Sequence, residues 1–298
     1  MKEKKMNVLL KRKGFIAALD QSGGSSKKTL LNYGISENEY KDEEEMFLKI
    51  HDMRKRIIMS PVFSKDKILG VILFKNTMER KIEDLYTADY LWNKKEILSF
   101  LKIDLGLDTL KNGVQLLKDI PNIDETLELS LKYNIFGTKM RSVIKEANEE
   151  GIKALVNQQF SLAKVISSYG LIPIIEPEVD INAKDKAVCE ELLLNEVKNE
   201  LKKLDSSVNV IFKFTLPTKE NFYDELLTYN NVLKLVALSG GYERDIANSK
   251  LKNNKNMIAS FSRALLEGLS IKQKENEFDN VLNETINSIY DASINKIE

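Results

Sequence analysis

The chain has 298 residues, of which 43% are hydrophobic and 30% are charged, so an intrinsically disordered or fibrous protein is excluded. Its 45 lysines and arginines balance 45 aspartates and glutamates, which argues against nucleic acid or a membrane surface as a partner bound by bulk charge. One cysteine cannot form an intrachain disulfide, and one histidine cannot build a histidine-rich metal centre.

The amino-terminal segment carries an apolar run of only three residues, Val8, Leu9 and Leu10. This run is too short for the core of a secretory signal. No later stretch approaches the roughly 20 apolar residues of a membrane span. The sequence therefore predicts a cytoplasmic protein.

Short apolar runs rich in β-branched residues recur along the chain, each bounded by Gly, Asn, Asp or Pro, and they predict eight strands. In chain order these are residues 14–19, 69–74, 98–104, 134–142, 170–179, 209–216, 233–240 and 257–262.

Segments with helical periodicity lie between the predicted strands. The first opens with the capping box Ser36-x-x-Glu39. The predicted helices span residues 36–59, 124–133, 151–169, 185–204 and 219–229.

Eight alternations of strand and helix favour a closed (β/α)8 TIM barrel, with residues 1–298 as a single domain. The rival architecture is an open doubly wound sheet, which usually carries a glycine-rich phosphate loop after its first strand. Here the turn after that strand reads DQSGGS, which fits neither common form of the loop. The barrel is the favoured fold.

Polar residues interrupt the apolar strands near their carboxyl ends, where a barrel builds its active site. Successive strand residues alternate faces, so the pairs Lys139/Arg141 and Glu176/Glu178 each place both side chains on one side. If that side faces the lumen, several charges converge on one pocket. The candidates are Asp20, Lys75, Lys102, Lys139, Arg141, Glu176, Glu178, Lys213, Ser239, Gly240, Gly241, Ser260 and Arg263.

Lys213 lies between Phe212 and Phe214 in an otherwise apolar strand. An ammonium buried there is costly unless it is paired or neutralised, and a neutral amine is a nucleophile. Glu176 offers a nearby carboxylate that could transfer protons or balance the lysines. His51 follows an acidic run in a predicted helix and is expected at the surface.

The chain resembles class I fructose-bisphosphate aldolases, and the short bacterial branch of that family in particular. The resemblance covers nearly the whole chain and rests on ALDQSGGS (AADEST in the animal enzymes), GVILF, LKID, TKMRS, PIIEPE, FKFT, LSGG and SFSRAL, all in family order. Two departures stand out: FKFT replaces the LKPN of the animal enzymes, and their long tail ending in tyrosine is absent.

The resemblance implies a role for each matching residue. Lys213 corresponds to the Schiff-base lysine, Glu176 to the general acid/base and Asp20 to the aspartate beside the imine. Lys139 corresponds to the lysine adjacent to the nucleophile. Lys102 and Arg141 correspond to residues around the hydroxyls and one phosphate, with Ser22 and Ser25 near the same end, and Ser239, Gly240 and Arg263 correspond to the other phosphate site. Glu178, Gly241 and Ser260 are expected to bind substrate as well.

An amine with the ordinary pKa of about 10.4 is neutral in only about one molecule in 2,500 at pH 7. A second ammonium about 4 Å away, at an effective dielectric constant of about 20, contributes roughly 4 kcal/mol toward deprotonation. The sequence therefore predicts that Lys139 alone suffices to keep the nucleophile neutral.

The activity that the resemblance implies is a metal-independent lyase acting on a small sugar bisphosphate, fructose 1,6-bisphosphate, with no cofactor. One alternative is a Schiff-base aldolase for another ketose bisphosphate, such as tagatose 1,6-bisphosphate. An alternative of a different class is a non-catalytic barrel that binds sugar phosphates or proteins. A homo-oligomer is compatible with the sequence, because contacts on a barrel's exterior cannot be read from one chain.

Overall fold

All eight predicted strands form within residues 2–297, which the computed structural model describes. They pair side by side in the order β1-β2-β5-β7-β8-β9-β10-β11, and every pair in this order is parallel. The strands are β1 (Phe15–Leu19), β2 (Ile68–Leu73), β5 (Leu98–Lys102), β7 (Gly137–Ile144), β8 (Ile172–Val179), β9 (Val210–Thr215), β10 (Val232–Leu238) and β11 (Met257–Ala259).

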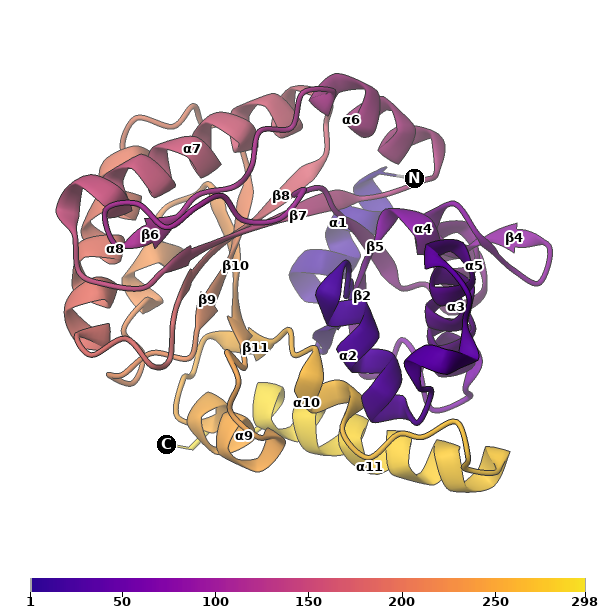
Figure 1. Ribbon diagram of the computed structural model, residues 1–298. Helices are drawn as coiled ribbons and strands as arrows, with labels where there is room; N and C mark the ends of the chain where they lie inside the picture. The colour runs from indigo at the N-terminus through magenta and orange to yellow at the C-terminus, as the bar shows by residue number, and fades with distance from the viewer. Residues whose placement is uncertain (1, 298) are drawn as a thin grey trace.

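The two ends of the sheet approach each other and nearly close it into a barrel. The backbone N–H of Ala18 in β1 donates to the carbonyl of Phe261, just after β11, at 3.3 Å. Two short additions lie outside this ring of strands. Strand β6 (Val114–Gln115) pairs antiparallel with β7, and β3 (Lys81–Ile82) pairs with β4 (Leu85–Tyr86) in a separate hairpin at the right of Figure 1.

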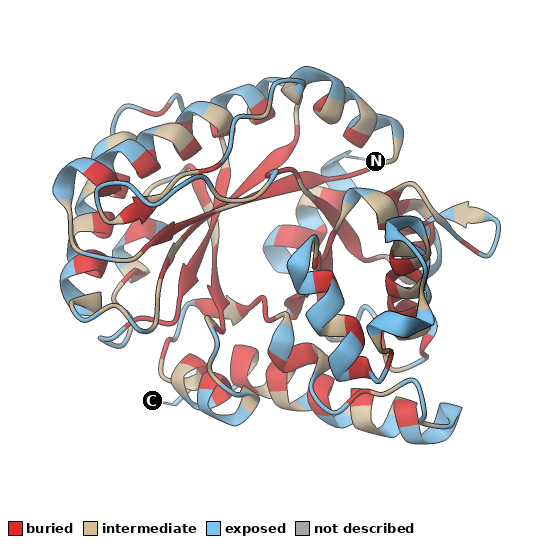
Figure 2. Cartoon of the chain, in the orientation of Figure 1, coloured by how far each residue is buried: buried red, intermediate tan, exposed pale blue. Residues whose placement is uncertain are grey.

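Helices surround the strands, and their buried residues face the sheet (Figures 1 and 2). The α-helices are α1 (Lys2–Lys11), α2 (Gly24–Tyr33), α3 (Glu43–Met59), α4 (Lys75–Met78), α5 (Thr87–Lys95), α6 (Ile123–Lys132), α7 (Glu149–Ser168), α8 (Lys186–Leu201), α9 (Arg244–Lys252), α10 (Arg263–Leu266) and α11 (Glu275–Ile294). Two 3-10 helices are η1 (Glu37–Glu39) and η2 (Asp224–Thr228).

The interior of the barrel is apolar toward the amino ends of the strands. Residues of β1, β2, β5, β8, β9 and β10 pack there, mostly at alternate positions, because side chains on one face of a strand recur every second residue. Val8 and Leu9 of α1 join this cluster, so α1 covers the amino end of the barrel. The strand residues in the cluster are Ile16, Ala18, Leu69, Ile72, Leu98, Phe100, Ile172, Ile174, Ile211 and Val236.

The structure differs from the sequence prediction in two helices. The capping box at Ser36 forms, but it begins η1 rather than a long helix, and α3 begins separately after Asp42, whose side chain accepts from Glu45 N–H at 2.9 Å. The predicted helix 219–229 is reduced to η2, because Asn221 has a left-handed φ of 58° that a helix cannot contain.

His51 is also not where the sequence places it. Only 6% of it is exposed, and its Nε2 lies 3.0 Å from the carbonyl oxygen of Lys81. The prediction of a surface histidine is therefore wrong: the acidic residues before it occupy the exposed start of α3, whereas His51 faces inward. Among residues 2–297, no helix is both long enough and apolar enough to span a membrane.

Candidate active site

The inward face of every barrel strand except β2 becomes polar at its carboxyl end. In β1 the inward residues Ile16 and Ala18 are followed two positions later by Asp20, and in β5 Leu98 and Phe100 are followed by Lys102. These polar ends open into a cavity of about 530 Å³. Every second side chain of a strand points inward. The alternation that builds the apolar interior therefore also directs the charged side chains into this cavity.

All but two of the predicted site residues, Gly241 and Lys75, line the cavity. Gly241 is not in its wall but lies beside it, since a Cβ on Gly241 would meet Arg263 Nη2 at 3.2 Å. Lys75, in contrast, starts α4 with its side chain 56% exposed. The predicted residues in the wall are Asp20, Ser22, Ser25, Lys102, Lys139, Arg141, Glu176, Glu178, Lys213, Ser239, Gly240, Ser260 and Arg263.

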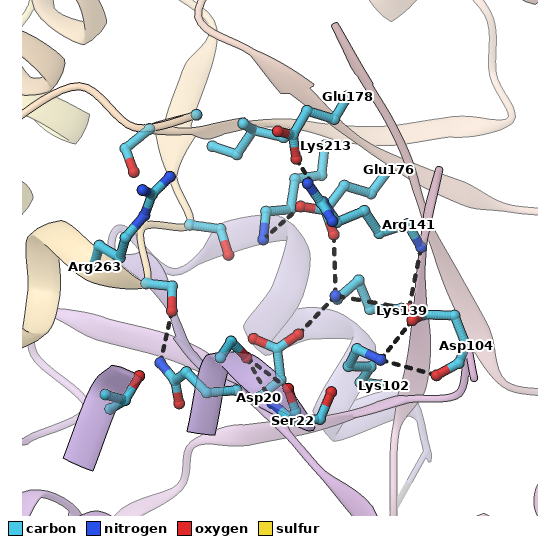
Figure 3. Close-up of a pocket in the computed structure, with 18 of the residues that line it drawn as sticks. Asp20, Ser22, Lys102, Asp104, Lys139, Arg141, Glu176, Glu178, Lys213 and Arg263 are labelled. Carbon is cyan, nitrogen blue, oxygen red and sulfur yellow. Dashed lines mark hydrogen bonds and ion pairs between the residues drawn. The ribbon is translucent and has the colours of Figure 1, made fainter. Parts of the chain in front are cut away.

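Lys139 is the centre of a buried ionic network (Figure 3). Its Nζ lies 2.6 Å from Asp20 Oδ2, 3.2 Å from Glu176 Oε2 and 3.9 Å from Asp104 Oδ2. Only 3% of the Lys139 side chain is exposed. Because a buried cation is costly unless paired, these carboxylates are what allow an ammonium at this depth.

Lys213 shares one of these carboxylates. Its Nζ lies 3.1 Å from Glu176 Oε1, and its side chain is buried in β9 between outward-facing Phe212 and Phe214. Glu176 therefore contacts one lysine with each oxygen. A carboxylate within hydrogen-bond reach of an amine can receive its proton, so this pair is arranged for proton transfer.

The network shifts the pKa values of its members in opposite directions. Burial raises the pKa of Asp20, but the positive charges of Lys139 and Lys213 lower it more, so the pKa of Asp20 lies well below its ordinary value. Burial lowers the pKa of Lys139, but Asp20, Glu176 and Asp104 together raise it further, so the pKa of Lys139 lies well above its ordinary value. Asp20 and Lys139 are therefore a fixed charge pair at neutral pH.

Lys139 is consequently not the lone cation that the sequence suggests. Glu176 contacts both amines, so Lys213 lies beside a negative charge as well as beside the ammonium of Lys139. The estimate of roughly 4 kcal/mol for an isolated ammonium is therefore an upper bound on its effect.

Two further ion pairs line the cavity beside this network. Lys102 Nζ donates to Asp104 Oδ1 at 2.5 Å and to the Asp104 carbonyl at 2.8 Å. Arg141 Nε donates to Glu178 Oε2 at 2.6 Å, and its backbone N–H donates to Asp104 Oδ2 at 3.2 Å. Asp104, which was not among the predicted residues, thus pairs with the Lys102 side chain and accepts from the backbone of Arg141. The sequence did contain a signal for Asp104. It lies two residues after Lys102, a spacing that places both side chains on the same side of a strand.

One end of the cavity carries a glycine turn and an arginine. Gly240 and Gly241 have φ values of 62° and 120°, which other residues rarely adopt, and a Cβ on Gly240 would lie 2.7 Å from Ile181 Cγ2. Arg263 forms no ion pair with any residue in the described part of the chain. A backbone turn next to an unpaired guanidinium is a suitable site for a phosphate.

The start of α2 also lines the cavity. Ser22 N–H donates to Ser25 Oγ at 2.9 Å, and Ser25 Oγ donates to the Ser22 carbonyl at 2.7 Å. Three α2 residues beyond Ser25 also line the cavity and were not predicted, although their spacing of three to four residues places them on one face of a helix. These are Lys28, Thr29 and Asn32. Gln21 and Ser262 also line the wall and were not predicted.

The fold and the site define a (β/α)8 barrel with a lysine-centred ionic cavity at the carboxyl ends of its strands. Comparison with known proteins adds the family. A family profile described as fructose-bisphosphate aldolase class-I matches residues 1–220. The chain belongs to the class I fructose-bisphosphate aldolases, a family of carbon–carbon lyases.

Two known proteins illustrate the relationship. The protein of Clostridium acetobutylicum named fructose-bisphosphate aldolase class 1 is 57% identical over 294 residues, which cover 99% of this chain and 100% of that protein. Among solved structures, fructose-bisphosphate aldolase from Plasmodium falciparum, in a complex with TRAP and a small molecule inhibitor, has a TM-score of 0.79. It shares 19% identity, over 100% of this chain and 96% of that chain. At that identity the structural likeness shows the fold alone.

Proposed function

We propose that this single-domain chain is a cytoplasmic aldolase that reversibly cleaves fructose 1,6-bisphosphate into dihydroxyacetone phosphate and glyceraldehyde 3-phosphate, in glycolysis and gluconeogenesis. The observation that carries the proposal is the buried Lys213 amine, 3.1 Å from Glu176 inside the cavity. A binding site for a sugar bisphosphate has no need of a buried amine, whereas an imine-forming enzyme requires one.

The reaction begins at Lys213. Its neutral amine attacks the C2 carbonyl of the open-chain substrate, and the carbinolamine loses water to give a protonated imine. Glu176 is the proposed acid/base, because its carboxylate already contacts the nucleophile. Lys139 and Asp20 hold the charge around the new iminium fixed.

Carbon–carbon cleavage follows from the iminium. A base removes the C4 hydroxyl proton, the C3–C4 bond breaks, and its electron pair moves into the iminium to form an enamine. Glyceraldehyde 3-phosphate leaves. Protonation of the enamine at C3 and hydrolysis of the resulting imine then release dihydroxyacetone phosphate and the free Lys213 amine. The imine provides the electron sink, so the proposed mechanism needs no metal or other cofactor.

The two ends of the cavity are proposed to hold the two phosphates. Around the imine-forming end, the turn of Gly240 and Gly241 supplies backbone N–H groups and Arg263 a planar guanidinium. The residues proposed to bind this phosphate are Ser239, Gly240, Gly241, Ser260 and Arg263. Those proposed to bind the hydroxyls and the other phosphate are Ser22, Ser25, Lys102, Arg141 and Glu178.

Cleavage kinetics test the substrate assignment. We expect fructose 1,6-bisphosphate to be cleaved with a higher kcat/KM than tagatose 1,6-bisphosphate, which differs in configuration at C4. Lys213→Met should abolish cleavage of both while the protein stays folded. Preference for the tagatose epimer would replace the proposed substrate, and an active Lys213→Met enzyme would overturn the mechanism.

A further inference from the structure

Arg54 is a guanidinium buried beneath the candidate active site without a carboxylate partner. None of its surface is exposed, and no ion pair between Arg54 and an acidic side chain forms within residues 2–297. It belongs to α3, outside the barrel, and no sequence motif drew attention to it. Burial lowers the pKa of Arg54 to about 9, against an opposing effect of Asp20.

Arg54 donates hydrogen bonds to the turn that follows β1 and to α4. Its Nη2 donates to the Gln21 carbonyl at 2.6 Å and to Gln21 Oε1 at 3.1 Å. Its Nη1 donates to Thr77 Oγ1 in α4 at 2.7 Å. An apolar side chain of similar size could fill this space without the cost of burying a cation, so these hydrogen bonds are what the guanidinium contributes.

Arg54 also determines how the Gln21 amide points. A guanidinium can only donate, so it requires the amide oxygen of Gln21 to face it. The amide nitrogen then faces the cavity wall, where it donates to Ser262 Oγ at 2.6 Å and to the Ala18 carbonyl at 3.2 Å. The turn after β1 is thereby tied to the turn after β11.

The residues next to this link belong to the active site. Asp20, which bonds Lys139 at the imine-forming centre, precedes Gln21 directly. Arg263, at the phosphate end, follows Ser262 directly. The link runs across the place where the sheet closes, between β1 and β11, beside the hydrogen bond from Ala18 to the Phe261 carbonyl given above.

We propose that Arg54 is a positioning residue of the aldolase site, which acts through Gln21 and Ser262 to fix Arg263 relative to Asp20. This inference rests on the proposed function. Its consequence is that a substrate with a phosphate at the imine-forming end depends on Arg54, because only such a substrate engages Asp20 and Arg263 together.

A double-mutant cycle tests the link. Arg54→Met removes the donors, and Ser262→Ala removes the acceptor at the far end. We expect each variant to lower kcat/KM for fructose 1,6-bisphosphate by about tenfold, mainly through KM, and to affect fructose 6-phosphate, which lacks the C1 phosphate, by less than about threefold. Because both changes break one chain of contacts, the double variant should stay within about threefold of Arg54→Met.

Losses that multiply to about a hundredfold, or equal losses on both substrates, would overturn the proposal and make Arg54 merely structural. If Arg54→Met does not fold, the cycle of Gln21→Met with Ser262→Ala tests the same link with the same expected and contradicting results. Imine trapping on wild-type enzyme, done in parallel, separates the two hypotheses. A wild type that forms the Lys213 imine but shows a multiplicative cycle contradicts only the positioning role of Arg54.

Discussion

At the scale of single residues, the core of the candidate site is an ionic network in which Lys139, Lys213 and Lys102 each contact a carboxylate. Lys213 and Glu176 were predictable, because charges within buried apolar strands have few structural uses. The carboxylate of Asp104 and the α2 residue Lys28 were not recognised, since they lie just beyond the strands or on a helix. The sequence does not show which charged side chains pair with one another. The structure shows that three carboxylates surround Lys139.

Replacing Lys139 with methionine keeps much of the side-chain volume and removes the charge. Asp20 and Glu176 then lose the Lys139 ammonium and act on Lys213, whose protonated form also loses a repulsive neighbour. Both effects favour the ammonium, so imine formation requires a higher pH. We expect the acid limb of kcat/KM to move upward by roughly one pH unit or more, and activity at pH 7 to fall at least about tenfold and recover partly in alkali.

Lys75→Met is the matched control, since that ammonium is exposed outside the cavity. Its pH profile should equal that of the wild type. If the acid limb of Lys139→Met stays in place while thermal melts show an intact fold, burial between Phe212 and Phe214 must keep the nucleophile neutral without help from Lys139.

Arg263→Ala addresses the phosphate at the imine-forming end. Arg263 contacts a ligand only if a phosphate is there, so the loss in kcat/KM should be about 2 to 4 kcal/mol on fructose 1,6-bisphosphate and much smaller on fructose 6-phosphate. Steady-state kinetics on both substrates give the comparison. Equal losses on the two substrates would assign Arg263 a structural role.

At the scale of secondary-structure elements, hydrophobic patterning predicted every strand of the barrel, because strands buried on both faces read as short apolar runs. The start of α3 was missed for a physical reason. Ser36 with Glu39 and Asp42 with Glu45 are both valid helix starts, and local sequence cannot choose between them. Closure of the sheet likewise depends on contacts between distant segments, which local patterns do not contain.

The packing of β7 between its neighbours gives a test at this scale. A Cβ on Gly137 would lie 2.1 Å from the Ile172 carbonyl oxygen in β8 and 2.8 Å from Phe100 Cδ1 in β5. Gly137→Ala must push these strands apart, so we expect a loss of at least about 3 kcal/mol in the free energy of unfolding. Gly24→Ala is the control, because nothing lies within 4 Å of its Cβ.

Denaturant unfolding of the two variants measures this difference. The control should stay within about 0.5 kcal/mol of the wild type, as expected for an open surface position. Equal stability of Gly137→Ala and the wild type would mean that the close approach of β7 to β8 is not needed for the barrel.

At the scale of the whole molecule, α1 covers one end of the nearly closed barrel, and the cavity lined by charged residues lies at the other end. The class of fold and the end of the barrel that carries the site could both be predicted, because parallel strands present their carboxyl ends on the same side. The size of the cavity and the hydrogen bond between Gln21 and Ser262 could not be predicted, because they depend on how the turns after β1 and β11 meet.

Metal removal tests the chemistry of the whole enzyme. With one histidine, the chain cannot furnish a histidine-rich zinc site, and an imine already provides the electron sink. We expect prolonged treatment with EDTA to leave the cleavage rate unchanged. A loss of activity that zinc or another divalent ion restores would contradict the imine mechanism.

The most direct measurement of the central claim is trapping of the imine itself. Borohydride reduces an iminium to a stable secondary amine but does not react with a free amine, so treatment in the presence of dihydroxyacetone phosphate should fix the mass of the reduced adduct on the protein. Peptide mapping by mass spectrometry is expected to place the adduct on Lys213, with Lys139 unmodified. An adduct on another lysine, or no adduct with active enzyme, would contradict the account.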